Sequence, residues 1–171
     1  SGKTEFIKDH FVRDINNPDN VLTPPDQMRW NPIDTPSKPT DLIDGLITFM
    51  YNSVISIHLY TANKSMDRYL YCADGEWLFV LQQGRLRFKT EMGIIEATPG
   101  EIVVMPRGIR YQVELLDDDA KGYIFESQAS HFFLPERGPI GANGLAEERH
   151  FLAPVANFED LTGDFELVTK F

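Results

Sequence analysis

The stretch from Asp74 to Glu114 constrains the fold most, because it alternates apolar and polar residues through several short runs. In one run Leu86 and Phe88 fall on one face and Arg87 on the other, which is the period of two of a strand with one buried side. Turn signals separate the runs at Gln83-Gly84, Met92-Gly93, Pro99-Gly100 and Arg107-Gly108. Turns recurring at this spacing predict an all-β sandwich or barrel.

Further strands are expected on both sides of this stretch. Apolar runs predict them over residues 46–51, 54–61, 68–72, 121–127 and 165–169. Residues 1–44 hold six prolines between Pro18 and Pro39, so we expect an extended proline-rich arm there. Its large apolar residues, Met28, Trp30 and Ile33, favour packing on the barrel or on another subunit. We therefore expect one domain with three parts: the arm (1–44), a barrel core (45–130), and a Gly/Pro-rich packing loop with a closing strand (131–171).

Composition excludes several classes of partner. The 171 residues carry 26 acidic and 16 basic side chains, a net charge of −10, which argues against nucleic acid and anionic membranes. No apolar run is long enough to span a membrane, and the amino terminus has no signal-peptide pattern. Cys72 is the single cysteine, so we expect no intrachain disulfide and a cytoplasmic location. The chain begins Ser-Gly-Lys, without methionine, which suggests a piece of a longer protein.

The spacing of Gly100, Pro106, Gly108 and Tyr111 gives the pattern G-x5-P-x-G-x2-Y. This pattern resembles the second cupin motif, with Tyr111 where that family has a histidine ligand. The resemblance implies a cupin-like jelly roll, a double-stranded β-helix with little helix.

The run LFVLQQG ending at Gly84 resembles the first cupin motif. The family's ligand glutamate would align with Trp77, or with Glu76 if the register shifts by one residue. Its histidine pair would fall between Leu70 and Ala73, where the chain has no histidine. An indole, a phenol and a thiol cannot replace two imidazoles and a carboxylate around iron. We therefore expect a barrel packed with side chains and no metal bound to this chain.

Other candidate residues read more simply as structural. His58 falls opposite the face that holds Ile55, Ile57 and Leu59, and we expect a partly exposed or hydrogen-bonded strand histidine rather than a ligand or catalyst. His131 and His150 stand in no triad pattern. The glycines at 138, 141 and 144 lack a P-loop lysine and the strand and helix that flank one. The apolar residues around them predict an ordered loop that packs on neighbours: Phe132, Phe133, Leu134, Phe151 and Leu152.

Longer segments carry a more specific resemblance, from about Gln27 to about Asp160. They are QMRW, NKSM, DGEWLFVLQQGRLRFKTEMG, PGEIVVMPRGIRYQVEL, KGYIFE and LPERGPIGANGLAEERHFLAPVANFED. They resemble the homogentisate 1,2-dioxygenase family. The resemblance implies an iron(II) enzyme of tyrosine and phenylalanine catabolism that opens the ring of homogentisate with dioxygen to give maleylacetoacetate. Glu136 and Arg137 depart from the family pattern.

The same resemblance implies that catalysis lies outside this chain. In the family, the iron ligands and the catalytic histidine belong to the carboxy-terminal part, and none maps onto His10, His58, His131 or His150. We therefore assign no catalytic, cofactor-binding or metal residue, and we expect Fe(II) to be liganded outside this chain. The expected partners are the missing C-terminal catalytic half and further copies, since the family is hexameric.

Three functions stay open at this point. The chain can be the non-catalytic jelly-roll part of a homogentisate 1,2-dioxygenase, inactive alone. It can be a free-standing metal-less cupin that acts as a small-molecule binding or regulatory module. It can also use the barrel pocket without metal, as cupin sugar epimerases do with His and Tyr. The length of the encoding reading frame would separate the first from the others.

Overall fold

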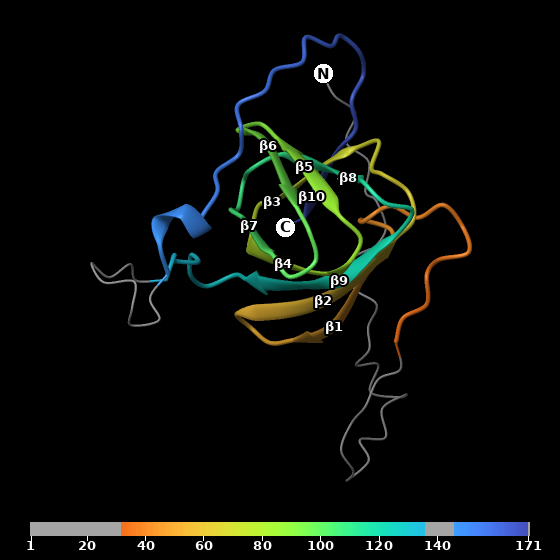
Figure 1. Ribbon diagram of the computed structural model, residues 1–171. Coiled ribbons are helices and arrows are strands. Elements are labelled where there is room, and N and C mark those ends of the chain that lie inside the picture. Colours follow the sequence, from red (N-terminus) through yellow and green to blue (C-terminus); the bar gives the residue numbers. More distant parts are fainter. Residues whose placement is uncertain (1–31, 136–145, 171) are drawn as a thin grey trace.

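The computed structural model describes residues 32–135 and 146–170, which form two five-stranded β-sheets packed face to face (Figure 1). In spatial order, the first sheet holds β1 (Leu46–Tyr51), β2 (Ile55–Ala62), β9 (Ala120–Ser127), β4 (Glu76–Gln83) and β7 (Ile102–Met105). The second holds β10 (Leu167–Lys170), β3 (Tyr69–Cys72), β8 (Tyr111–Leu115), β5 (Leu86–Thr90) and β6 (Gly93–Ala97). A 3-10 turn, η2, covers Glu148–His150. The expected all-β jelly roll is confirmed.

The predicted turns coincide with the described glycines that have positive φ. These are Gly84, Gly93, Gly100 and Gly108. Gly93 is needed for a second reason, because a Cβ there would lie 2.2 Å from the Val155 carbonyl oxygen. The residue that turns the chain between β5 and β6 therefore also lets a distant segment approach.

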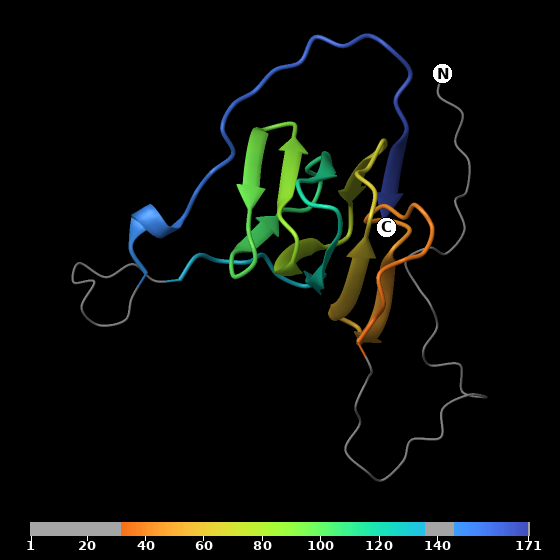
Figure 2. The ribbon, with the colours of Figure 1, turned by 45° about the vertical axis from the view of Figure 1, so that its right-hand side comes forward.

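That distant segment returns the chain to the barrel. Val155 pairs with Ile94 at the β6 edge through two backbone hydrogen bonds of 2.7 and 2.8 Å. Residues 155–166, the return segment, then lead around the barrel to β10, which pairs in parallel with β3 at the opposite edge of the same sheet (Figure 2). On the way Phe165 contacts the ring of Tyr69, with centroids 6.0 Å apart. The last part of the chain thus contributes to both edges of the second sheet, as a bridge beside β6 and as the edge strand β10.

The core lies between the sheets and is rich in aromatic rings. Its largest fully buried side chains are Trp77, Tyr60, Tyr111, Phe79 and Phe88. Leu42 and Ile43, just ahead of β1, also belong to it. The rest of the expected arm that the structure describes, from Pro32, is mostly exposed, whereas Met28 and Trp30 lie outside the described residues. Within the described ranges, no helix has the length and apolar character of a membrane span.

The inner face of β2 is the polar one. His58 and Tyr60 point into the core with 2% and 1% exposure, while Ile55, Ile57 and Leu59 are only half-buried on the outside. The sequence predicts a partly exposed or hydrogen-bonded strand histidine, and His58 is the second of these, buried and hydrogen-bonded. In a sheet with two largely apolar faces, alternation reveals the period but not which face turns inward.

Candidate functional site

The barrel interior holds aromatic rings where a cupin would place metal ligands. Trp77 and Tyr111 both point inward and are 1% exposed. Phe79 lies against both, with ring centroids 5.8 Å from Trp77 and 6.2 Å from Tyr111. Neither an indole N–H nor a buried phenol is a ligand for a divalent ion, and burial raises the pKa of Tyr111 well above its usual value.

Glu76 does not belong to the interior, so the alternative register of the motif is wrong. Side chains alternate along β4, and Glu76 shares the outer face with Leu78. Its carboxylate binds His131 Nδ1 at 2.5 Å and accepts a hydrogen bond from the Phe132 backbone N–H at 2.8 Å. Burial would raise the pKa of Glu76, but these two hydrogen bonds outweigh it and lower the pKa. The pair fastens the segment after β9 onto the outside of the barrel.

Among the described residues, the interior contains one carboxylate with no exposure, that of Glu126 on β9. It accepts hydrogen bonds from His58 Nε2 at 3.0 Å, Trp77 Nε1 at 3.0 Å and Lys170 Nζ at 2.7 Å. Burial alone would raise the pKa of Glu126, but the hydrogen bonds from His58, Lys170 and Trp77 and the charge of Lys170 lower it to about 2. Glu126 is thus an ionised group at 0% exposure whose oxygens are occupied by protein donors. We call these four residues the Glu126 network.

Both nitrogens of His58 are engaged. A carboxylate only accepts, so Nε2 carries the hydrogen toward Glu126, and Nδ1 lies 2.8 Å from Thr48 Oγ1. In a neutral ring Nδ1 then accepts the Thr48 hydroxyl hydrogen. No lone pair of this imidazole is directed at an open coordination position, and the described residues place no other histidine in the core.

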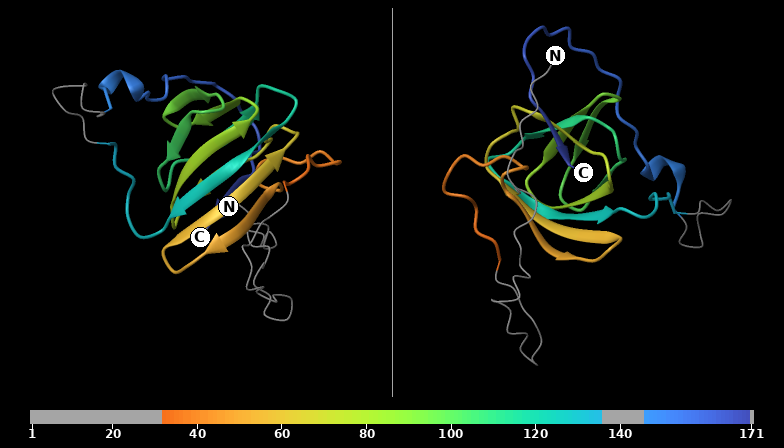
Figure 3. Two further views of the ribbon diagram at one scale, coloured as in Figure 1. Left: turned by 60° about the horizontal axis from the view of Figure 1, so that its bottom comes forward. Right: turned by 180° about the vertical axis from the view of Figure 1, so that it is seen from behind.

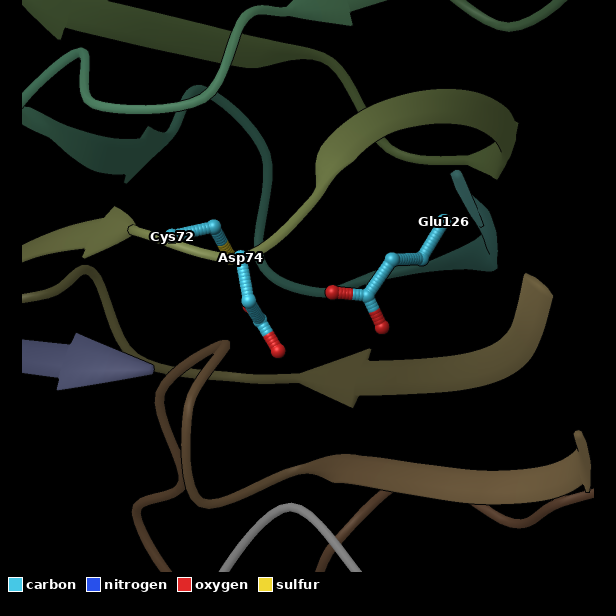
Figure 4. A group of neighbouring side chains, drawn as sticks. All are labelled: Cys72, Asp74 and Glu126. Atoms are coloured by element: carbon cyan, nitrogen blue, oxygen red, sulfur yellow. The ribbon is translucent and has the colours of Figure 1, made fainter. Parts of the chain in front are cut away.

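One group of side chains has the donor types of a metal site. Ligand atoms of Cys72, Asp74 and Glu126 all lie within 4.8 Å of one another (Figure 4). The Lys170 ammonium, however, lies 2.7 Å from Glu126 Oε1 and 3.0 Å from Asp74 Oδ2, so a protein cation already pairs with both carboxylates and offsets one of their two charges. The pKa of the Cys72 thiol is raised, mainly by burial and to a smaller extent by the charge of Glu126. The thiolate, which is the form that binds metal, is therefore disfavoured. These residues do not fit a resident iron(II).

A shallow hollow of 280 Å³ lies between the second sheet and the return segment. Its lining includes Lys89, Arg110 and Glu159. Lys89 pairs with Glu114 at 2.7 Å and with Glu159 at 3.6 Å, and Arg110 pairs with Glu91 at 3.1 Å. Because the lining cations are already paired, the hollow has no strong means of selecting an anionic substrate.

Two core hydroxyls, those of Tyr60 and Tyr111, have no hydrogen-bond partner among the described residues. Removing an unpaired buried hydroxyl costs little, since the folded protein loses no hydrogen bond. We expect the free energy of unfolding of Tyr111→Phe to lie between about 0.5 kcal/mol below and about 1 kcal/mol above the wild-type value. Urea unfolding of the wild type and the variant measures this. A loss above about 1 kcal/mol would reveal a hydrogen-bond partner of the hydroxyl.

Comparison with known proteins decides the family. The family model described as homogentisate 1,2-dioxygenase N-terminal matches residues 3–171. The chain belongs to this family. Over 153 residues it is 52% identical to the homogentisate 1,2-dioxygenase of Pseudomonas syringae pv. syringae and 48% identical to that of Pseudomonas entomophila. Each alignment covers 86% of this chain and 35% of the relative. The chain thus spans about a third of the length of these curated relatives.

Solved cupin structures are also similar, at low sequence identity. A cupin-2 domain protein from Shewanella frigidimarina is 18% identical with a TM-score of 0.42, covering 48% of this chain and 78% of its own. An RmlC-like cupin with a double-stranded β-helix fold from Methanocaldococcus jannaschii is 10% identical with a TM-score of 0.46, covering 60% and 94%.

Sequence reasoning predicted that Trp77 and Tyr111 lie in the barrel interior but missed the Glu126 network. Trp77 and Tyr111 are inside as the motif spacing predicts. Glu126 lies in the run KGYIFES, where Tyr123 and Phe125 form an equally apolar alternative face. The sequence offers one signal: Glu126 lies two residues after Ile124 on the same strand, so the two side chains share a face. If Ile124 points inward, the Glu126 carboxylate must be buried as well.

Proposed function

We infer that this chain is the non-catalytic jelly-roll part of a homogentisate 1,2-dioxygenase that converts homogentisate to maleylacetoacetate in tyrosine and phenylalanine catabolism. Fe(II) and the catalytic groups then belong to the carboxy-terminal part of the polypeptide. In the intact enzyme this barrel would scaffold that half within a homo-oligomer. A cytoplasmic location fits the lone cysteine, Cys72, which is buried and free.

The observation that carries the proposal is the content of the barrel interior. Trp77 and Tyr111 fill the positions that the motif resemblance assigns to ligands, and Lys170 supplies the positive charge beside the buried Glu126 and the half-buried Asp74. An active iron site needs two imidazoles, a carboxylate and open positions for oxygen and substrate. The described part of this chain has one interior histidine, His58, and both of its nitrogens are engaged.

The chain purified alone is expected to carry no stoichiometric iron and to consume no oxygen with homogentisate. Both follow from the ligand positions held by an indole and a phenol. Elemental analysis after dialysis against ferrous iron, and an oxygen electrode with homogentisate, measure the two quantities. The matched control is the dioxygenase expressed from the complete reading frame under the same conditions. About one iron per 171-residue chain, or measurable ring opening, would overturn the proposal.

The free-standing cupin module has less support. A small-molecule binding barrel keeps a cavity between its sheets, whereas here Trp77, Tyr60, Tyr111, Phe79 and Phe88 fill that space. The same filling disfavours a metal-free reaction in the barrel pocket. A reading frame that ends at Phe171 would favour the free-standing module.

A further inference from the structure

The two sheets of the barrel present outer faces of opposite character. On the second sheet, Arg87 lies between Glu96 and Glu114 in register and pairs with both, at 2.7 and 3.4 Å. Lys89 adds pairs to Glu114 and to Glu159 of the return segment. This outer face is therefore a ladder of charges, suited to water and partly shielded by the chain itself.

The first sheet has an outer face of two apolar rows that cross all five strands. Strand register aligns Ile47, Leu59, Tyr123, Val80 and Ile102 in one row and Met50, Ile57, Phe125, Leu78 and Val104 in the next. We call these two rows the apolar face. None of its side chains is charged, in a chain whose net charge is −10. The five strands lie side by side in Figure 3, with β1 and β2 at one margin.

Much of the apolar face is open to solvent. Ile102 is 60% exposed, Met50 45% and Tyr123 43%. The charged group nearest to it on β4, Glu76, is buried beneath His131 and the Phe132 backbone. Exposed contiguous apolar surface of this kind marks an interaction site.

The segment after β9 extends the same surface. Phe132 packs on Phe125 of the apolar face, with ring centroids 5.9 Å apart. Phe133 and Leu134 follow it and are 86% and 58% exposed. Within the described part of this chain these two residues are exposed, so the expectation that the loop packs on neighbours stays a prediction for them. Their exposure beside the apolar face indicates that the neighbour they need is another part of the protein.

We propose that the apolar face, with Phe133 and Leu134, is the surface on which the remaining part of the dioxygenase polypeptide docks. The curated relatives are about three times as long as the matched region, which is 35% of each. A covalently attached segment reaches the face at an effective concentration of the order of millimolar, far above that of a free partner. Its matching surface must be apolar and free of charge, because a charge buried against these rows would have no partner on this side.

This inference rests on the proposed function in one respect, that the chain works as part of a longer dioxygenase. Methionine oxidation tests it without using activity, because oxidation to the sulfoxide follows solvent exposure. Met50 lies on the apolar face and Met92 lies on the β5–β6 turn of the other sheet, and they are 45% and 64% exposed. Met66 and Met105, which are 4% and 5% exposed, serve as buried references.

The isolated chain and the intact dioxygenase are each treated with hydrogen peroxide, and sulfoxide at each methionine is followed by peptide mass spectrometry. In the isolated chain Met50 and Met92 should oxidise at similar rates. In the intact enzyme we expect oxidation of Met50 to slow about tenfold while that of Met92 stays within about twofold. Equal oxidation of Met50 in both proteins would overturn the proposal, as would equal protection of Met50 and Met92.

A charge variant provides a second arm. Ile102→Lys, on the edge strand β7, should leave the melting temperature of the isolated chain unchanged and lower that of the intact enzyme, whereas Met92→Lys should change neither. Protection of Met50 that appears in the isolated chain when its concentration is raised would assign the face to a second copy and contradict the proposal. Iron binding by the isolated chain would defeat the proposed function and leave these measurements unaffected.

Discussion

Glu126→Ala is expected to lower the free energy of unfolding by about 3–5 kcal/mol, the usual cost of removing one partner of a buried ion pair. The substitution takes from the Lys170 ammonium, 13% exposed, its fully buried partner at 2.7 Å and leaves it only Asp74, which is 33% exposed, at 3.0 Å. It also deprives Trp77 Nε1 and His58 Nε2 of their acceptor. Urea unfolding at pH 7, followed by far-ultraviolet circular dichroism, measures the loss.

An exposed ion pair gives the matched control for Glu126→Ala. Arg85 and Asp117 also lie 2.7 Å apart, but with 52% and 39% exposure, so Asp117→Ala should cost no more than about 1 kcal/mol. The double variant Glu126→Gln/Lys170→Met removes both charges of the pair, and we expect it to be more stable than Glu126→Ala, in which the largely buried ammonium keeps only the half-exposed Asp74 as a partner. The single variants Glu126→Gln and Lys170→Met complete the double-mutant cycle. If the losses of stability in these two variants add up to that of the double variant, or if Glu126→Ala loses less than about 1 kcal/mol, the network is not coupled.

The pH dependence of this difference has a definite sign. The pKa of Glu126 falls from 4.5 to about 2 on folding, so its contribution to stability is complete well above pH 4.5 and is lost as the pH falls towards 2. The stability gap between the wild type and Glu126→Gln should narrow over that range. The stability cost of Asp117→Ala, at the exposed Arg85–Asp117 pair, serves again as the reference and is measured over the same pH range.

The meander was predictable from the sequence because local rules determine it. In the runs 86–90 and 93–97 the outer side carries charged residues, Arg87 and Lys89 in the first and Glu96 in the second, so both period and orientation follow from the residues there. The run Ile102–Met105 is apolar on both sides, and only its position in the meander is predicted. Each turn is marked by a glycine that the backbone needs at positive φ. The inward positions of Trp77 and Tyr111 were likewise predictable, since a motif spacing places side chains on a known face.

Orientation of the first sheet was not predictable in the same way. In β2 the outer face is the more apolar one, and in β9 both faces hold apolar residues, whereas the inner faces are the ones with His58 and Glu126. Long-range contacts favour turning the His58 and Glu126 faces inward. One of them is with Lys170 on β10, which lies 44 residues beyond Glu126 in the sequence (170 − 126). Nothing local to either residue reveals that pairing. An apolar outer face also misleads pattern reasoning, because the pattern assumes that the outside is wet.

Gly122→Ala is expected to destabilise the barrel by at least about 3 kcal/mol or to prevent folding, since overpacking against backbone cannot be relieved by rotamer changes. Gly122 lies on the inner face of β9, between β2 and β4. A Cβ there would lie 2.2 Å from the Val80 carbonyl oxygen and 2.7 Å from the Tyr60 hydroxyl. Relief would require the central strands of the first sheet to separate, which would break their hydrogen bonds.

Two further variants separate the backbone clash at Gly122 from other causes. Tyr60→Phe in the Gly122→Ala background removes the hydroxyl contact but leaves the Val80 carbonyl, so it should recover little of the lost stability. Gly163→Ala in the return segment meets its nearest atom, on Phe165, only at 3.9 Å, and it should stay within about 0.5 kcal/mol of the wild type. Thermal and urea unfolding of the isolated chain measure all three. A Gly122→Ala chain that unfolds within about 1 kcal/mol of the wild type would mean that β9 and β4 can separate locally without loss of the core, and the close approach at Gly122 would then have no structural role.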